Sequence, residues 1–116
     1  LQVKSNIQRS RIQLEASYLN VQTVKNTVYK DVVTAFNEYI AARSKYESSY
    51  KSYKAQEKAF AFTKARFDQG LMSYADFSIQ NTNRIRAEIN FINAKYEYLF
   101  RTKVIDFYTK GKIELN

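Results

Sequence analysis

Apolar residues recur every seven positions along the N-terminal part of the chain, with polar residues between them. One such series contains Ile7, Leu14, Val21, Val28, Ala35 and Ala42, and a second contains Val32, Tyr39, Tyr46, Tyr53, Phe60 and Phe67. Where the two series overlap they alternate steps of three and four residues, which is the spacing of a coiled-coil seam. The pattern predicts one long helix over about residues 3–68, with large side chains of one series interdigitating with small ones of the other.

This pattern stops within RFDQGLMSYADF, residues 66–77, and restarts beyond it. The chain has two glycines and no proline, and one of these glycines, Gly70, suits the left-handed position that ends a helix. Ser73 is expected to be the N-cap of a new helix, and Asp76, three residues later, to complete a capping box. We therefore predict a turn at about residues 69–73, capped by Gly70, Ser73 and Asp76, and a second helix over about residues 74–108.

The second helix carries apolar residues on more than one face. The stripe that continues the coiled-coil seam is Ile85, Ile89, Ile92, Tyr96 and Leu99, which alternates steps of four and three. Another stripe, on a different side, is Phe91, Tyr98 and Ile105, with Phe100 and Val104 nearby. The first helix is expected to contribute to the seam the residues Val28, Ala35, Tyr39, Ala42, Tyr46, Tyr53, Phe60 and Phe67. A single partner helix would cover only one face of the second helix.

The predicted fold is all-α, a long antiparallel helical hairpin or coiled coil that occupies residues 1–116 as a single region. At about 1.5 Å per residue the first helix is on the order of 100 Å long and the second roughly half of that. The returning helix would then cover the first only from about Thr34 to the turn. The seam residues left without a partner would be Val3, Ile7, Leu14, Val21 and Val28. Exposed stripes of this kind mark interfaces. We expect either oligomerisation or a missing segment of a longer protein.

Composition narrows the class of protein without deciding the function. The 116 residues carry a net charge of +8, a pI near 9.7 and a mean hydropathy of -0.53. No stretch approaches the roughly 18 apolar residues of a membrane span, and the opening LQVKSNIQRS has neither an initiator Met nor the apolar region of a signal peptide. This start is typical of a processed or excised piece. The positive charge fits an acidic partner or a solvated helical surface, and the mixing of basic with acidic residues favours the surface.

The chemistry available to the chain is limited. There is no Cys and no His, which excludes disulfides, thiolate chemistry and imidazole-based catalysis. The carboxylates, such as Glu97 and Asp106, are scattered, and no Gly-rich phosphate loop is present. We predict that the chain is not an enzyme and has no cofactor and no metal site.

Two motifs give the chain a resemblance to a known family. The long helix, the turn ARFDQGLMSYADF and the return INAKYEYLFRTKVIDFY resemble the C-terminal helical hairpin of the TolC-like outer membrane efflux proteins. The family's turn pattern, aromatic-x-x-Gly-[Leu/Thr]-x-[Ser/Thr]-x-x-Asp, is matched by Phe67, Gly70, Leu71, Ser73 and Asp76. Its return motif, Ala-x-Tyr-x-Tyr-Leu, is matched by Ala94, Tyr96, Tyr98 and Leu99.

The resemblance implies a passive conduit. Members of the family are trimers whose long helices form a periplasmic tunnel (an α-barrel), continuous with a β-barrel in the outer membrane of Gram-negative bacteria. They serve efflux or type I secretion, with energy supplied by an inner-membrane transporter. By this resemblance the chain is the periplasmic hairpin of the second structural repeat, without the barrel strands and the first repeat.

The resemblance also implies a role for the turn, at the periplasmic end of the tunnel. There Gly70, Leu71, Met72 and Ser73 would contact a periplasmic adaptor (membrane fusion) protein, and Asp76 would lie at the tunnel entrance. Met72 stands where some members have a gate-locking Arg, and Ile79 where some have a second acid, so neither a polar lock nor a double acidic ring is expected. The capping role of Asp76 stays open beside the entrance role.

Two other functions remain as alternatives. A basic coiled-coil module that binds nucleic acid would use the charge of +8 and the many Tyr side chains. The seam positions of most aromatic residues and the interspersed acids speak against it. A soluble scaffold hairpin is the second alternative. We favour the conduit, with no nucleic acid as partner.

Overall fold

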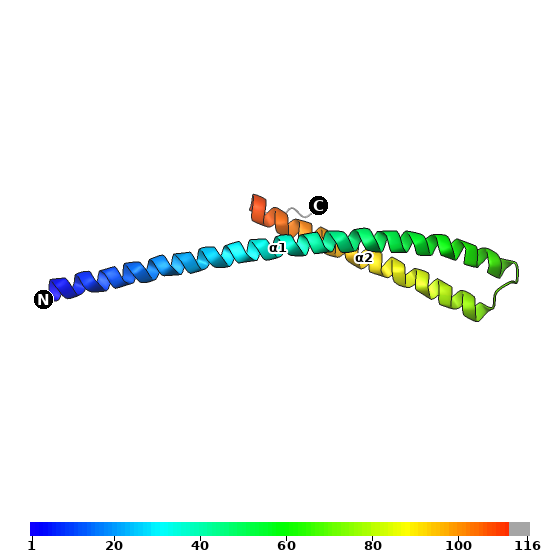
Figure 1. Ribbon diagram of the computed structural model, residues 1–116, viewed down its shortest axis with the longest axis horizontal. Coiled ribbons are helices and arrows are strands. Elements are labelled where there is room, and N and C mark those ends of the chain that lie inside the picture. Colours follow the sequence, from blue (N-terminus) through cyan, green and yellow to red (C-terminus); the bar gives the residue numbers. More distant parts are fainter. Residues whose placement is uncertain (112–116) are drawn as a thin grey trace. The chain divides into compact units, whose positions relative to one another are not determined.

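The structure of the protein is a computed structural model, in which residues 1–111 are described. Within this range the chain forms two helices, α1 (Gln2–Asp68) and α2 (Tyr74–Lys110), joined by a short turn (Figure 1). The predicted all-α hairpin is confirmed. The helix α2 continues two residues beyond the predicted end at residue 108, because Gly111, with φ of 70°, is the residue that takes up the left-handed conformation and stops it. The tail predicted after Gly111 lies outside the described residues.

The chain divides into two units, Leu1–Ala35 and Phe36–Asn116. In the first unit the residues form the N-terminal part of α1, and its seven-residue apolar series is exposed. The exposed fractions are 55% for Ile7, 72% for Leu14, 51% for Val21 and 52% for Val28, with Val3 at 72%. Such a row of exposed side chains agrees with the expectation that this unit requires a partner.

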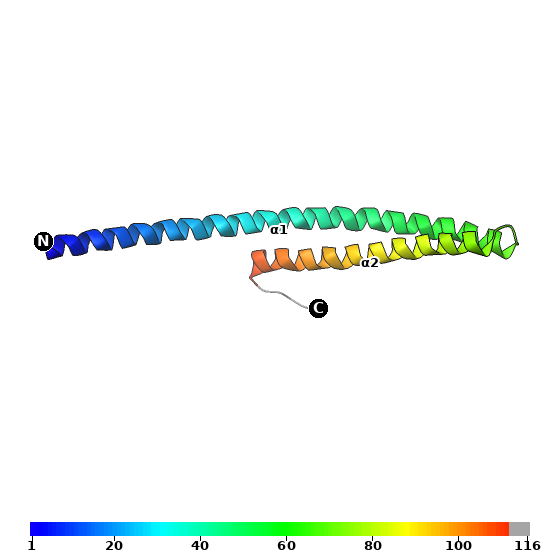
Figure 2. The same ribbon diagram turned by 90° about the horizontal axis from the view of Figure 1, so that it is seen from below.

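In the second unit α2 runs antiparallel to the Phe36–Asp68 part of α1 (Figure 2). The predicted aromatic series of α1 forms the centre of this interface. The ring of Tyr46 stacks on Phe91 and Tyr98, with centroids 5.7 and 5.3 Å apart, and Tyr53 stacks on Phe91 at 5.3 Å. Between the rings lie the small residues Ala42 and Ala94, which are 3% and 1% exposed. Large rings beside small side chains let the two helices approach closely.

The predicted seam residues of α2 do not pack on α1. Its residues are exposed: Ile85 by 40%, Ile89 by 52%, Ile92 by 41%, Tyr96 by 66% and Leu99 by 44%. The stripe that packs on α1 is the other one, which includes Phe91 and Tyr98. Flat rings stack on the aromatic series of α1, whereas branched Ile side chains do not complement it in this way. The ring stacking thus decides between two stripes of similar periodicity.

Polar groups at the ends and edges of this interface support the packing. The hydroxyls of Tyr39 and Tyr98 lie 3.5 Å apart, and this hydrogen bond raises the pKa of Tyr39.

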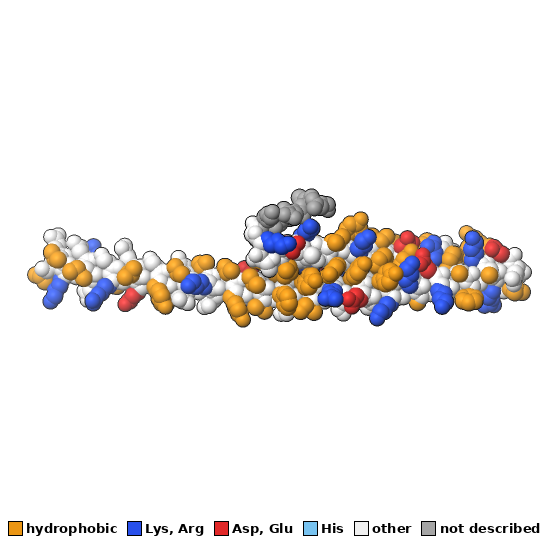
Figure 3. Space-filling view, turned by 90° about the horizontal axis from the view of Figure 1, so that it is seen from above, with side chains coloured by type: hydrophobic (Ala, Val, Ile, Leu, Met, Phe, Trp, Pro, Cys, Tyr) orange, Lys and Arg blue, Asp and Glu red, His pale blue; other side chains and the backbone are white. Residues whose placement is uncertain are grey.

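On the face shown in Figure 3, Lys and Arg side chains of the hairpin are interspersed with Asp and Glu. The basic residues of the second unit therefore do not form a continuous block on this face.

Candidate functional site

The turn between the helices is closed by backbone hydrogen bonds around Gly70. The amide of Leu71 donates to the carbonyl of Arg66, and the amide of Gly70 donates to the carbonyl of Phe67, both at 2.9 Å. This pair of bonds is the Schellman motif, which requires the left-handed conformation at its glycine. Gly70 has φ of 73°. The last carbonyls of α1 thus have partners within the turn itself.

Ser73 begins the second helix. Its backbone is extended, with φ of -71° and ψ of 154°, and its hydroxyl accepts a hydrogen bond of 3.2 Å from the amide of Asp76. The reciprocal bond, in which the Ser73 amide would donate to the Asp76 carboxylate, is not formed within residues 1–111. The physical reason is length, since the capping box uses Glu or Gln at this position and Asp is one methylene shorter. Asp76 therefore keeps an exposed carboxylate in the first turn of α2.

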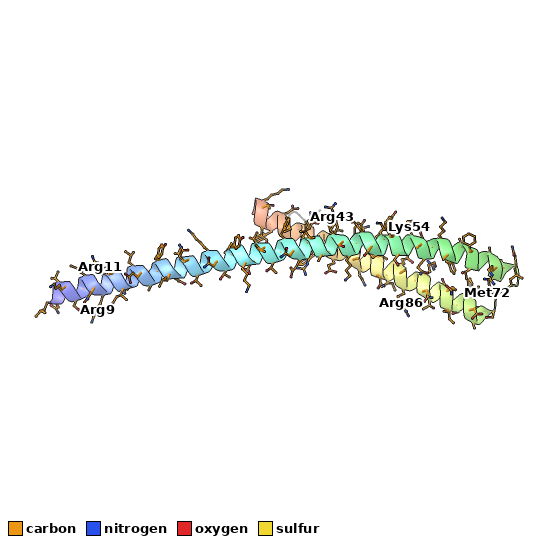
Figure 4. The ribbon with its side chains drawn as sticks, in the orientation of Figure 1. Arg9, Arg11, Arg43, Lys54, Met72 and Arg86 are labelled. Carbon is orange, nitrogen blue, oxygen red and sulfur yellow. The ribbon has the colours of Figure 1, made fainter. Side chains whose placement is uncertain are left out.

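An apolar surface lies at the end of the hairpin. Leu71 is 64% exposed and Tyr74 is 72% exposed, while Met72 is half-buried at the turn (Figure 4). In many Schellman motifs the residue after the glycine packs back on the helix, but Leu71 is left free. Tyr74 was not among the predicted site residues. Its place directly after the N-cap, at the tip, was the one feature of the sequence that could have identified it.

Stacked rings hold the two arms together just behind the tip. Phe67 stacks on Phe77 with ring centroids 4.3 Å apart, and Phe60 lies 5.6 Å from Phe77. The guanidinium of Arg84 lies over the Phe60 ring, 5.0 Å from its centroid. These contacts fix the first turn of α2 against the last turns of α1. The tip residues are thus displayed from a rigid base.

A small polar cluster lies further along α1. The Tyr53 hydroxyl donates to Glu57 Oε1 at 2.7 Å, and Lys54 Nζ lies 3.1 Å from Glu57 Oε2. The hydrogen bond from Tyr53 and then that from Lys54 lower the pKa of Glu57. The hydrogen bond between Tyr53 and Glu57 also raises the pKa of Tyr53. The cluster joins the aromatic interface to the charged surface, but no other titratable group converges on it from α2 within hydrogen-bond distance in the described part of the chain.

Within residues 1–111 no three His, Cys, Asp or Glu side chains are placed to hold a metal ion. No helix in the same range combines the length and the apolarity needed to cross a membrane.

Comparison with known proteins identifies the family of this chain. The model of the outer membrane efflux protein family matches residues 2–103, which is most of the chain. This chain belongs to the outer membrane efflux protein family. The resemblance seen in the turn and return motifs is thereby confirmed. No curated protein and no solved structure matches the chain.

Membership of the outer membrane efflux protein family has direct consequences. Its proteins are transport conduits of the outer membrane and not enzymes, in agreement with the predictions. They generally form oligomers and work with adaptor proteins. The match includes the whole turn and all but the last residues of α2, so both arms of the hairpin and its tip are family elements.

Proposed function

We propose that the hairpin forms part of the wall of a periplasmic tunnel in a trimeric outer membrane efflux or type I secretion channel, and that its tip binds a periplasmic adaptor protein. Its action is passive, since an inner-membrane transporter supplies the energy. The observation that carries the proposal is the tip, where a closed Gly70 turn exposes Leu71 and Tyr74 at the end of a stacked base. Exposed apolar side chains on a rigid element are suited to binding a partner protein.

The residues of the tip have distinct roles in this proposal. Leu71 and Tyr74 supply apolar contact area, with Met72 beside them, while Gly70 and Ser73 give the turn its shape. The exposed carboxylate of Asp76 is available to line the tunnel entrance, because it is not engaged with the Ser73 amide.

The proposal is tested in the full-length protein by placing a photo-crosslinking residue at Leu71. The expected result is a crosslinked product with the adaptor in cells that contain both proteins. Lys51 is the control position, since it is exposed on α1 and lies far along the chain from the turn. A crosslink to the adaptor should not form from that position.

Export provides the second half of the test. Leu71→Glu places a charge in the apolar contact and is expected to reduce adaptor-dependent export without lowering the amount of oligomer in the outer membrane. Lys51→Glu should leave export unchanged. If Leu71→Glu exports normally and the crosslinker at Leu71 captures no adaptor, the tip is not the docking surface.

A further inference from the structure

A polar groove runs along one side of the hairpin, between α1 and α2. It encloses about 610 Å³ and is lined by Lys45, Ser48, Ser49 and Ser52 from α1 and by Ala87, Asn90 and Asn93 from α2. The groove arises because Ser49 and Ala87 are too small to fill the space between the helices. Its hydroxyl and amide groups can both donate and accept hydrogen bonds.

A smaller hollow continues the groove away from the turn. It encloses about 140 Å³, and Lys45, Glu97, Glu38 and Arg101 contribute to its lining. Two ion pairs connect the helices here, Lys45 Nζ to Glu97 Oε2 at 3.3 Å and Arg101 Nη1 to Glu38 Oε2 at 2.7 Å. The two basic groups of this hollow are thus each paired with an acidic group.

Arg101 Nε indicates that this side is hydrated. The atom is buried and has no hydrogen-bond partner within residues 1–111. A buried donor of this kind is normally satisfied by protein or by water. The hollow beside it is large enough for water, which needs a space of at least about 10–15 Å³ and polar neighbours.

The outward side of α2 has the opposite character. Ile85, Ile89 and Ile92 are exposed there, at a spacing suited to packing against another helix. Where helices stand side by side in a wall, burying the groove would remove water from its Ser, Asn and charged groups, at a cost in free energy. Burying the Ile side chains is favourable instead. The two sides of the hairpin are thus suited to different surroundings.

We propose that the groove side faces the water-filled conduit, whereas the Ile stripe packs against a neighbouring helix of the same assembly. This inference rests on the proposed tunnel function and assigns the residues that passing solutes meet. Those groups are hydroxyls, amides and compensated ion pairs. At this level the wall offers hydrogen bonds to polar solutes, because its lining consists mainly of hydroxyl and amide groups.

The experiment uses single cysteines, since the chain has none of its own. Ser52→Cys exchanges one atom at the exposed rim of the groove on α1, and Asn90→Cys places a thiol opposite it on α2. Each variant of the full-length protein is reconstituted in a planar lipid bilayer, with the protein lacking the new cysteine as reference. Single-channel conductance and reversal potential are recorded before and after a charged thiol reagent is added.

Both groove variants are expected to react and to lose conductance. A cationic reagent should shift the reversal potential toward anion selectivity, and an anionic reagent should shift it toward cation selectivity, because a charge in the conduit wall attracts counterions. Ile89→Cys is the matched control, one residue from Asn90 and outside the groove. It should be protected from the reagent and keep its conductance.

The other outcomes overturn the inference. A groove cysteine that reacts without any change of conductance lies on the outside of the tunnel, and one that does not react is buried in a helix contact. Rapid reaction at Ile89→Cys with a loss of conductance would show that the Ile stripe, and not the groove, faces the conduit. If the protein without added cysteines forms no channel at all, the proposed function itself fails, which is a result distinct from these.

Discussion

Gly70 is the residue on which the shape of the turn depends most directly. It has φ of 73°, and the space around a Cβ at this position is empty, with no atom within 4 Å. A side chain would therefore be opposed by the backbone conformation alone and not by a steric clash with a neighbour. A substitution at this position therefore measures the cost of the left-handed backbone conformation without an added steric clash.

We expect Gly70→Ala to lower the free energy of unfolding by about 1–2 kcal/mol, the usual cost of the left-handed conformation for a residue with a Cβ. Gly70→Val should cost at least as much, because a β-branched residue tolerates positive φ poorly. Gly70→Asn is the control, since Asn enters this region more readily. Urea unfolding followed by circular dichroism at one fixed protein concentration measures all three. Equal stabilities for Ala, Asn and Gly would show that the turn does not need the left-handed residue.

Tyr53 and Glu57 give a prediction about pH. The Tyr53 hydroxyl is the first cause of the lowered pKa of Glu57, so Tyr53→Phe should raise that pKa toward its ordinary value while keeping the ring that stacks on Phe91. A carboxylate with a lowered pKa stabilises the fold above its unfolded pKa, and this contribution is lost as the pH falls through the folded pKa. The stability difference between Tyr53→Phe and the unchanged protein should thus be present at neutral pH and vanish in acid.

Carboxyl NMR titration of Glu57 measures the pKa directly, and urea unfolding at several pH values measures the stability difference. Tyr46→Phe is the matched control, because Tyr46 belongs to the same aromatic stack and its hydroxyl has no hydrogen-bond partner within residues 1–111. It should leave the Glu57 pKa unchanged. An unchanged Glu57 pKa in Tyr53→Phe would contradict the assigned cause.

At the residue scale, the features that the sequence predicts are those that depend on a few neighbouring residues. The N-cap at Ser73 and the reversal at Gly70 depend on a few adjacent residues, and the structure has both. The missing half of the capping box at Asp76 follows from the length of one side chain and could have been anticipated. The exposure of Leu71 and Tyr74 could not, because it depends on where the two helix ends lie in space.

At the scale of the helices, the interface depends on rings that alternate with small side chains. Ala94 is 1% exposed and lies in the part of α2 that packs on α1. The periodic pattern predicted both helices but could not choose between the two apolar stripes of α2, because both repeat at helical spacing. The deciding factor is the shape of the opposing surface, a row of Tyr and Phe rings on α1, which spacing alone does not contain.

Overpacking tests this view of the interface. Ala94→Leu adds bulk where the helices are closest and is expected to lower the free energy of unfolding by about 1–3 kcal/mol. Ala61→Leu is the control, since Ala61 is exposed on α1 and Leu is nearly as good a helix former as Ala. Urea unfolding at a fixed protein concentration compares the two. Equal stability of both variants would mean that the helices are not closely packed at Ala94.

At the scale of the whole molecule, exposed apolar rows are present in both units. The first unit exposes Ile7 and Leu14, and the second exposes Ile89 and Ile92. In a water-soluble monomer such rows would be unfavourable, whereas members of this family generally function as oligomers. The same surfaces therefore indicate that the chain in solution associates.

We expect light scattering after size exclusion to give a mass above that of one chain, and helicity to rise with protein concentration, because association stabilises the folded form by mass action. Ile7→Gln combined with Leu14→Gln should weaken this association, since each buried side chain of this size contributes about 1.5–3 kcal/mol. Ser5→Gln combined with Asn20→Gln introduces the same residue type at exposed polar positions of the same helix and should change the mass little. A fully helical monomer at micromolar concentration would contradict the expectation, because it would show that these rows need no partner to remain folded.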